Sequence, residues 1–410
     1  MTKLYGNAIV GQSGGPTAAI NATLSGVVRG CFEAEQIKTV YGAINGVEGI
    51  LNETICDLGS QLDSEDKLRL LEQTPAAALG SCRKKLPKYS DEPEIYNKLL
   101  EVFKKYDIRY FFYIGGNDSM DTVAKLSEFV NGAGYEMRVM GVPKTIDNDL
   151  VGTDHTPGFG SAAKYIATVM QEILLDAAVY TTKAVTIVEF MGRDAGWLTA
   201  AAALTRKHGI SPDMIYLPEV DFDFEKFYED IEKAFETHPN VVVAVSEGAR
   251  TADGKYVGES AQSGAVDVFG HKYLSGTGKA LELAVKNKFG CKVRSVEINL
   301  PQRCAAHLRS KTDIDESVTV GRGAVRAAVN GETGKMACFI RESGEEYRCS
   351  VGLCDISSVA NAIRKVPREM INERANNVTD ACVDYIYPLI CGEADCVFDQ
   401  GLPAIFKVKK

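Results

Sequence analysis

The stretch MRVMGVPKTIDND, residues 137–149, joins a strand-like run to a dense group of charged side chains. Residues 137–142 favour a strand, and Pro143 then fixes one backbone angle and removes an amide donor, so we expect regular structure to end there. A lysine, a threonine and two aspartates follow. In extended backbone the carboxylates of Asp147 and Asp149 share a face, so one can hold a cation while the other takes a proton. An ordinary turn rich in Asp and Asn is the alternative interpretation.

The composition indicates a globular chain of two or three domains. The chain has 410 residues, of which 45% are hydrophobic and 25% charged, and its net charge is −9. This acidic balance argues against nucleic acid or anionic lipid as a partner, but it is compatible with small phosphorylated ligands held by local donors. We expect no membrane-spanning segment and no signal peptide. The eleven cysteines lack the spacing of a zinc site, so we expect reduced thiols and a cytoplasmic location.

Strands alternate with helices along most of the chain. A strand at 7–10, a glycine turn at 11–17 and a helix at 18–30 form one such unit, and residues 109–130 form another. The strand before the opening stretch is the third. Later strands are expected at 183–190, 240–245 and 294–300. This alternation predicts an α/β fold with a mainly parallel sheet and helices on both faces, and ligands on such sheets lie at the carboxyl ends of the strands.

Glycines and cations follow several of these strand ends. The turn containing Gly14 and Gly15 suits an anion because backbone amides and a positive helix end point at it, although it matches neither dinucleotide fingerprint. Arg83 follows a glycine turn in a basic loop, which could equally be solvated surface. Other charged residues lie in or beside strand ends, where an arginine suits bidentate phosphate binding but is often only a surface or salt-bridged side chain: Arg193, Glu247, Arg294 and Arg303.

The C-terminal part of the chain carries no evident chemistry. Residues 313–330 and 355–372 read as helices, and residues 381–389 read as a strand. We expect this part to serve for packing and as an oligomer surface.

Five motifs together resemble the phosphofructokinases. In chain order they are SGG at 13–15, GGNDS at 115–119, PKTIDND at 143–149, MGR at 191–193 and SEG at 246–248. Their order and approximate spacing both fit that family. The resemblance implies two Rossmann-like lobes with mainly parallel sheets flanked by helices, and an active site in the cleft between them. It places a phosphoryl-donor lobe at 1–141, to which later segments return, a fructose 6-phosphate lobe at 142–305, and a C-terminal packing segment at 306–410.

The resemblance also implies an activity and its residues. Members of the family transfer a phosphoryl group from ATP or pyrophosphate to the 1-hydroxyl of fructose 6-phosphate, so Mg²⁺ and a homodimer or homotetramer are expected. The residues implied for the donor are Gly14, Gly15, Arg83, Asp118 and Lys144. The residues implied for catalysis are Asp147 as general base, with Thr145, Lys144, Asp118 and Asp149. The residues implied for fructose 6-phosphate are Thr145, Ile146, Asp147, Met191, Gly192, Arg193, Glu247, Arg294 and Arg303. The residues implied for the metal are Asn117 and Asp118.

Two positions favour pyrophosphate as the donor. Small glycines occupy the positions of Asp118 and Lys144 in the ATP-using members, so this chain is similar to the pyrophosphate-dependent branch. The Asp118 carboxylate would stand where the α-phosphate of ATP lies and would repel it, and Lys144 would add a cation beside the smaller donor. We therefore expect a reversible transfer from pyrophosphate that serves glycolysis or gluconeogenesis.

Three positions depart from the family pattern, and other functions stay open. Asn117 stands where many relatives carry a metal-binding aspartate, and Leu300 stands where they often carry histidine or tyrosine. Ala184 replaces an arginine that reaches a neighbouring subunit in many relatives, and Lys183 is a candidate substitute. The alternatives are an ATP-dependent enzyme and a non-catalytic sugar-phosphate-binding regulatory subunit. A lipid or NAD kinase is disfavoured by the complete MGR motif.

Overall fold

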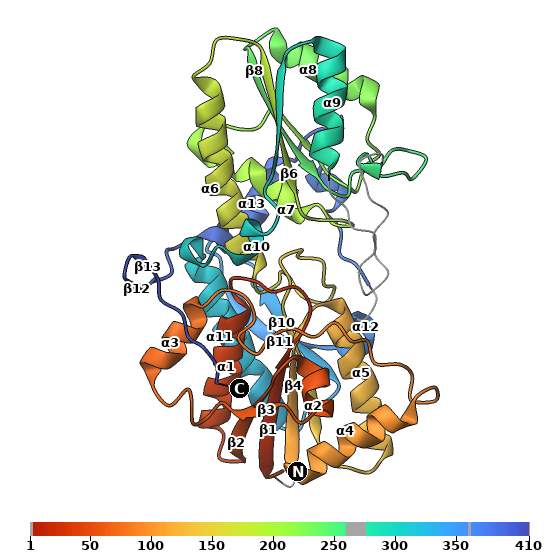
Figure 1. Ribbon diagram of the computed structural model, residues 1–410, viewed down its shortest axis with the longest axis vertical. Coiled ribbons are helices and arrows are strands. Elements are labelled where there is room, and N and C mark those ends of the chain that lie inside the picture. Colours follow the sequence, from red (N-terminus) through yellow and green to blue (C-terminus); the bar gives the residue numbers. More distant parts are fainter. Residues whose placement is uncertain (1–2, 260–275, 360–361, 410) are drawn as a thin grey trace.

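The chain forms two lobes, one above the other in Figure 1, each built on a mainly parallel sheet flanked by helices. The computed structural model describes residues 3–259, 276–359 and 362–409. The predicted α/β class with two mainly parallel sheets is confirmed. Within the described ranges, none of the helices has the length and apolar character needed to cross a membrane.

The first lobe is built on a seven-stranded sheet in the order β11-β10-β5-β4-β1-β2-β3. Its strands are β1 (Gly6–Gln12), β2 (Ile37–Ala43), β3 (Ile55–Asp57), β4 (Ile108–Gly115), β5 (Arg138–Pro143), β10 (Lys335–Arg341) and β11 (Cys349–Asp355). Only the two edge strands, β3 and β11, run antiparallel to their neighbours. The helices of this lobe are α1 (Ile20–Glu33), α2 (Gly46–Leu51), α3 (Glu65–Gln73), α4 (Pro93–Lys105), α5 (Asn117–Gly132) and α11 (Lys311–Val329).

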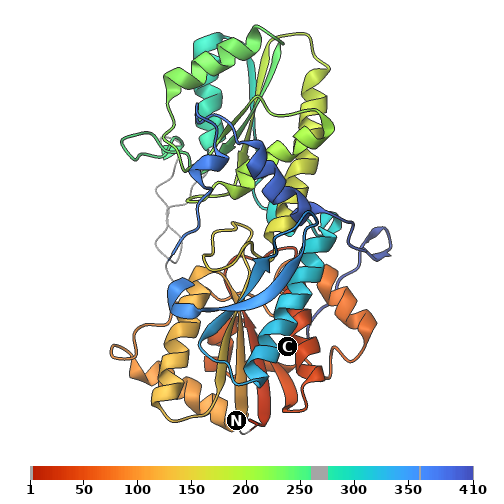
Figure 2. The same cartoon turned by 180° about the vertical axis from the view of Figure 1, so that it is seen from behind.

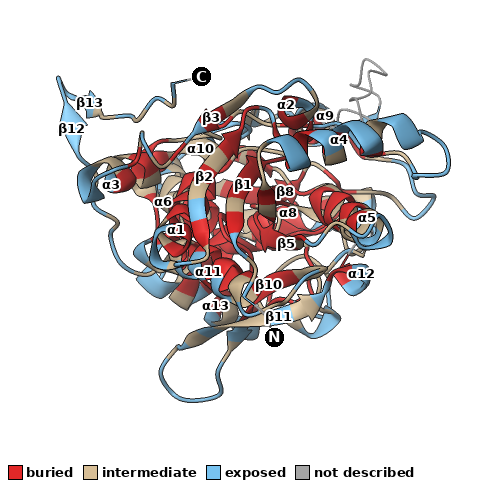
Figure 3. Ribbon diagram, turned by 90° about the horizontal axis from the view of Figure 1, so that it is seen from below, coloured by how far each residue is buried: buried red, intermediate tan, exposed pale blue. Residues whose placement is uncertain are grey.

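Helices cover both faces of this sheet, which explains why its central strands are apolar from end to end. Side chains of α1 and α11 join one core cluster with alternate residues of the sheet, and those of α4 and α5 join the other. Seen from below in Figure 3, the strands form a buried layer between these helices. Ser64 caps α3, because its hydroxyl accepts a hydrogen bond from the amide of Lys67.

The second lobe is built on a smaller, fully parallel sheet in the order β7-β8-β6-β9. Its strands are β6 (Ala184–Phe190), β7 (Met214–Tyr216), β8 (Asn240–Ser246) and β9 (Lys292–Glu297). Its helices are α6 (Phe159–Ala178), α7 (Trp197–Ala200), α8 (Phe224–Phe235), α9 (Thr277–Phe289), α10 (Pro301–Cys304) and the 3-10 helix η1 (Ala201–His208). The carboxyl ends of both sheets face the region between the lobes (Figure 1).

The C-terminal part differs from the prediction. The helix expected at 355–372 is limited, among the described residues, to α12 (Ile356–Val359) and a 3-10 turn at Arg368–Met370. Residues 362–367, which we call the strap, are irregular and pass from the first lobe to the second (Figure 2). The strand expected at 381–389 is instead α13 (Asp380–Ile386) and a 3-10 turn. Its buried Cys382, Val383 and Ile386 follow helical spacing and pack into the core of the second lobe.

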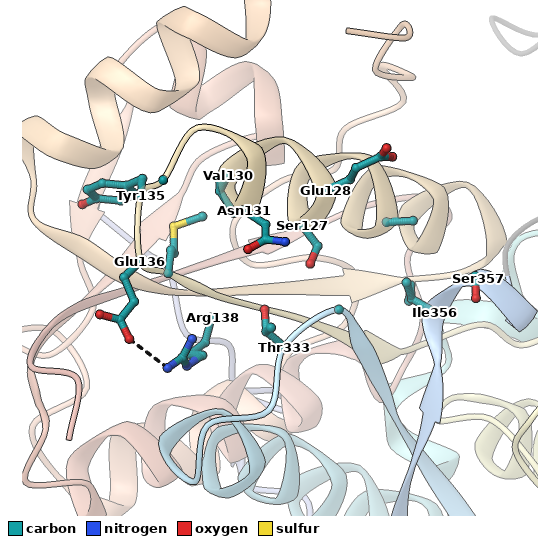
Figure 4. Close-up of a pocket in the computed structure, with 14 residues that line it drawn as sticks. Ser127, Glu128, Val130, Asn131, Tyr135, Glu136, Arg138, Thr333, Ile356 and Ser357 are labelled. Carbon is teal, nitrogen blue, oxygen red and sulfur yellow. Dashed lines mark hydrogen bonds and ion pairs between the residues drawn. The ribbon is translucent and has the colours of Figure 1, made fainter. Parts of the chain in front are cut away.

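A pocket of about 600 Å³ lies beside the start of β5, at the opposite end of this strand from residues 144–149. Figure 4 shows Ser127 and Asn131 of α5 facing it, together with Thr333 and the ion pair between Arg138 and Glu136. None of the motif residues lines this pocket. The motif residues lie instead at and beyond the carboxyl ends of the strands.

Candidate active site

Two glycine turns meet the catalytic loop (residues 144–149) at the ends of β1, β4 and β5. The amide of Ser13 donates to the carbonyl of Ile114, and the amide of Lys144 donates to the carbonyl of Gly115, both at 2.9 Å. Gly14 has a φ of +77°, a left-handed conformation that favours glycine. Its amide donates to the carbonyl of Cys82, which brings the loop carrying Arg83 alongside the first turn.

Lys144 reaches across to the first glycine turn. Its ammonium donates to the carbonyl of Gly15 at 2.6 Å, and a side chain on Gly14 would begin 3.3 Å from it. Lys144 is 2% exposed. The pKa of Lys144 is lowered to about 8, mainly by burial; Asp147 and Asp149 oppose this change, and the Arg303 and Arg83 cations add to it. Lysine, arginines and aspartates are thus gathered at one place.

The two aspartates of the catalytic loop, Asp147 and Asp149, have raised pKa values because nearby groups offset little of the cost of burying their charges. Asp147 accepts a long hydrogen bond, 3.4 Å, from the Thr145 hydroxyl, which itself accepts from the Asp147 amide at 3.1 Å. Burial raises the pKa of Asp147, and Lys144 works against this rise. Burial, and next the neighbouring Asp147, raise the pKa of Asp149 to about 7. A carboxylate with a raised pKa can take up a proton near neutral pH, as a general base must.

The loop after β6 meets the end of β8. The Gly192 amide donates to the Glu247 carboxylate at 3.2 Å, and the Ser246 hydroxyl donates to the Gly192 carbonyl. Gly192 has a φ of +129°, and a Cβ there would lie 2.6 Å from the Ala195 carbonyl, so only glycine fits. Burial, then Asp147, raises the pKa of Glu247 to about 8. Glu247 is thereby held against the loop that carries Arg193.

Arg193 and Arg303 supply cations on the second-lobe side. Arg193 lowers the pKa of both Asp147 and Glu247, and its Nε is buried without a hydrogen-bond partner in the described part of the chain. Nη1 of Arg303 would lie 3.7 Å from a Cβ on Gly15. Arg303, which the resemblance implies for the sugar phosphate, thus also borders the donor turn. Both arginines are placed to meet a phosphate between the lobes.

Two residues implied for fructose 6-phosphate lie differently. Arg294 is on β9 opposite Thr186, four residues before the end of β6, and its half-exposed side chain lies 4.0 Å from Asp176 of α6. The structure therefore does not bring it to the catalytic loop of its own chain. Ile146 is 7% exposed and belongs to the core of the second lobe, so its backbone alone can face a substrate. Met191 does lie in the loop, where its amide donates to Gln302 at 3.3 Å.

Asn117 and Asp118, the residues implied for the metal, are engaged elsewhere. In the amide orientation that satisfies its neighbours, the Asn117 nitrogen donates to the carbonyls of Val359 and Ala362 at 3.2 and 3.1 Å. Asp118 forms an ion pair with Lys85 at 2.9 Å. The sequence does not predict the Lys85 contact, because the resemblance implies Asp118 for the donor and the metal, and the basic loop that carries Lys85 could equally be solvated surface. These contacts occupy the amide nitrogen of Asn117 and one carboxylate oxygen of Asp118.

The chemistry of the catalytic loop fits Mg²⁺ better at Asp149. Asp147 and Asp149 are two residues apart, and each carboxylate raises the cost of ionising its neighbour. A divalent cation with phosphate oxygens would relieve this repulsion, and Mg²⁺ prefers one or two carboxylates together with phosphates. Among the described residues, neither aspartate forms an ion pair within 4.0 Å. Their oxygens therefore keep the capacity to bind such a cation.

Comparison with known proteins gives one consistent family. The phosphofructokinase family model matches residues 7–297. The chain is 41% identical to the pyrophosphate–fructose 6-phosphate 1-phosphotransferase of Halomonas elongata, over 98% of this chain and 96% of that one. It is 39% identical to the protein of the same name from Methylococcus capsulatus, over 97% and 94%.

A solved structure agrees with these sequences. The pyrophosphate-dependent phosphofructokinase of Nitrosospira multiformis superimposes with a TM-score of 0.88 at 37% identity, covering 98% of this chain and 96% of that one. The similarity therefore extends over both lobes and the C-terminal part, beyond the five motifs.

Proposed function

We propose, from the premise that this chain belongs to the phosphofructokinase family, that it transfers a phosphoryl group from pyrophosphate to the 1-hydroxyl of fructose 6-phosphate. The products are fructose 1,6-bisphosphate and phosphate. The observation that carries the proposal is the meeting of Lys144, anchored on the carbonyl of Gly15, with Asp147. A donor-side cation and an acceptor-side base are thereby adjacent, as phosphoryl transfer requires.

The transfer divides between the two lobes. The turn at Gly14 and Gly15, with Arg83 and Lys144, binds pyrophosphate; the Gly14 amide is already bonded to the Cys82 carbonyl, so Gly14 contributes the shape of the turn and not its amide. The loop with Arg193 and Glu247 binds the sugar phosphate, and Arg303 lies between the two. Asp147 accepts the proton of the 1-hydroxyl as that oxygen attacks the phosphorus atom. The bond from the phosphorus to the bridging oxygen breaks, and phosphate leaves.

Mg²⁺ would be held by Asp149 and by oxygens of the donor. When bound, it neutralises charge on the transferring phosphoryl group. The chain's own part is to hold the Asp147 carboxylate beside the acceptor hydroxyl and to keep Lys144 at the donor turn.

The choice of donor follows from the same contacts. Lys144 occupies the space above Gly14, and Asp118 is fixed at the start of α5 by Lys85. By their bulk and charge, these two side chains would hinder a nucleotide chain that continues beyond the second phosphate. Replacing both with Asp118→Gly and Lys144→Gly should relax the exclusion of ATP, and a double variant that still rejects ATP would show that another element selects the donor.

One assay tests the proposal directly. Purified protein is given fructose 6-phosphate and Mg²⁺ with pyrophosphate, with ATP, or with both. Turnover with pyrophosphate and none with ATP is expected, as is formation of pyrophosphate from fructose 1,6-bisphosphate and phosphate. Turnover with ATP alone would refute the proposed donor, and binding of fructose 6-phosphate without turnover on either donor would indicate a regulatory subunit.

Arg294 supports a homo-oligomeric assembly. It borders a small groove with Asp176 and Ala184, beside the exposed apolar side chains of Val179 and Tyr180. We propose that this face contacts a second copy and that Arg294 serves the sugar-phosphate site of that copy. Lys183, the candidate substitute for the missing arginine, instead places its ammonium over the Phe235 ring.

Mixed oligomers test this assembly. Arg294→Ala and Asp147→Asn are each expected to be nearly inactive, and co-refolding the two variants should restore activity because some sites then combine intact residues from both copies. No recovery in a demonstrated mixed oligomer would exclude the shared site.

A further inference from the structure

The strap makes direct contact with the back of the catalytic loop. The amide of Arg364 donates to the carbonyl of Asp149 at 2.7 Å, and its guanidinium donates to the carbonyl of Asn148 at 3.4 Å. Asn148 is fully buried and has a φ of +53°, a left-handed conformation that costs free energy outside glycine. Surrounding contacts must hold the loop in this conformation, and Arg364 provides two of them.

The hydroxyl of Tyr385 completes this support. It accepts hydrogen bonds from the Asn148 side-chain amide at 3.1 Å and from the Arg364 guanidinium at 3.0 Å. It donates to the carbonyl of Asp154 at 2.7 Å. One donor and two acceptor positions are all that a hydroxyl offers, so this group is fully used. Tyr385 thereby joins the strap, the middle of the catalytic loop and the segment that follows it.

The strap also contacts the loop that carries Arg193. Trp197, four residues further along that loop, is fully buried and donates from its indole nitrogen to the Arg364 carbonyl at 3.1 Å. The Arg364 guanidinium lies 4.5 Å from the Trp197 ring centre, and the Tyr385 ring lies 5.1 Å from it. The same guanidinium lies 5.3 Å from the Tyr385 ring centre, so a partly buried cation is attracted to two aromatic rings.

Bonds at both ends fix the strap itself. The carboxylate of Glu219 accepts the amide of Val366 at 2.9 Å and the amide of Gly196 at 2.8 Å, which ties the strap to the Arg193 loop a second time. At its start, the carbonyl of Ala362 accepts from Asn117, the first residue of α5. One short segment is thus bonded to the donor side, the catalytic loop and the acceptor side.

We infer that the strap is a positioning element of the reaction, with Arg364 and Tyr385 as its positioning residues. This inference rests on the proposed transfer. Neither side chain touches the reacting atoms in the proposed mechanism. They hold the backbone of Asn148 and Asp149 against the loop that carries Arg193. The distance between the base, Asp147, and the arginine that binds the sugar phosphate thereby stays constant. A misplacement of about 1 Å at such a site can cost a hundredfold in rate.

The test compares three substitutions by steady-state kinetics with pyrophosphate. Tyr385→Phe keeps the ring and removes only the hydroxyl, and Arg364→Leu removes the guanidinium. Arg368→Leu is the matched control, because Arg368 also donates to backbone carbonyls, those of Ile371, Asn372 and Glu373, but only to residues three to five positions after itself. We expect kcat to fall about 10- to 100-fold for the first two, with both KM values within about threefold. The control should keep kcat, and Arg364→Lys, which restores the cation, should recover part of the loss.

A second measurement does not depend on turnover. Hydrogen–deuterium exchange of the amides at 145–150 should quicken in Arg364→Leu and Tyr385→Phe and stay unchanged in Arg368→Leu. The inference is overturned if kcat and exchange match the unaltered protein, if KM alone rises, or if the control loses kcat equally. Because the unaltered protein is assayed alongside, absence of its own turnover would count against the proposed transfer, whereas the exchange result would still decide whether the strap orders the loop.

Discussion

Two groups of charged side chains, each with members between residues 144 and 155, behave in opposite ways. The open cluster comprises Lys144, Asp147, Asp149 and Glu247, and the pKa of each is shifted toward the neutral form. The paired cluster comprises Asp154, His155, Glu316 and Arg341. Asp154 accepts hydrogen bonds from His155 at 2.9 Å and from Arg341 at 3.0 Å. On its other side, His155 is 2.8 Å from Glu316, whose second oxygen accepts from Tyr347 at 2.7 Å.

The difference lies in what each group leaves unused. In the paired cluster, each charged side chain forms a hydrogen bond or ion pair with another member, so these charges can stabilise the fold. In the open cluster, within the described part of the chain, no ion pair joins these side chains to an opposite charge. Buried charges left in this state cost stability and are typical of functional sites. Substitutions in the two clusters should therefore have opposite consequences.

The largest expected effect is on catalysis. Asp147→Asn keeps the size of the side chain but removes the base, so kcat should fall by about a hundredfold or more, while the Kd for fructose 6-phosphate changes only a few-fold. Single-turnover kinetics and equilibrium binding would measure the two quantities. Asp315→Asn, on the exposed side of α11 beside Lys311, is a control that should change neither. Collapse of sugar binding would mean that Asp147 is structural.

The next effect is a loss of stability from the paired cluster. Glu316→Gln leaves His155 with one carboxylate partner, and breaking a buried pair typically costs about 3 kcal/mol of unfolding free energy. Urea denaturation would measure it. kcat should stay within about twofold of the unaltered protein. A variant of undiminished stability would show that the pairing does not support the fold.

The same substitution in the open cluster should act in the opposite direction. Glu247→Gln retains an oxygen for the Gly192 amide but removes a charge that burial disfavours. The folded pKa of about 8 exceeds the ordinary value near 4.3, so the charge costs stability increasingly between these pH values. Unfolding free energy should rise by about 1–2 kcal/mol at pH 7, while KM for fructose 6-phosphate increases. A drop in stability would place Glu247 with the paired residues.

The smallest effect is a dependence of stability on pH. Burial lowers the pKa of His155, but its hydrogen bonds to Asp154 and Glu316 outweigh burial and raise it overall. The charged histidine therefore contributes stability that is fully present below about pH 6.5 and is lost as pH rises through the folded pKa. The difference in unfolding free energy between the protein and His155→Gln, measured by urea at several pH values, should shrink over that interval by about 1 kcal/mol. A constant difference would contradict the assignment.

The α/β fold and the central residues of the site could be predicted from the sequence because both depend on local patterns. Alternating strands and helices fix which strand ends share an edge, so Lys144 and Asp147 could be placed beside the glycine turns without coordinates. Arg294 illustrates the limit, since its position along β9, rather than its presence near a strand end, decides which site it can reach.

The strap and the paired cluster could not be foreseen for a related reason. Arg364 acts through backbone carbonyls and aromatic rings, which leave no motif, and its partner Asn148 lies 216 positions earlier. His155 and Glu316 are separated by 161 positions, and each alone reads as an ordinary polar residue. Distant pairing of this kind depends on how the lobes pack, which the residue pattern of either segment does not encode.

The separation of 216 positions between Asn148 and Arg364 has a consequence for biosynthesis. Translation proceeds at about 5–20 residues per second and domains tend to fold in the order they are made, so Arg364 follows the catalytic loop by roughly 10 to 40 s. During that interval a nascent chain can fold much of its first lobe while the catalytic loop still lacks its contacts with the strap. Full turnover would then be reached only after the strap has been synthesised and has bonded to the loop.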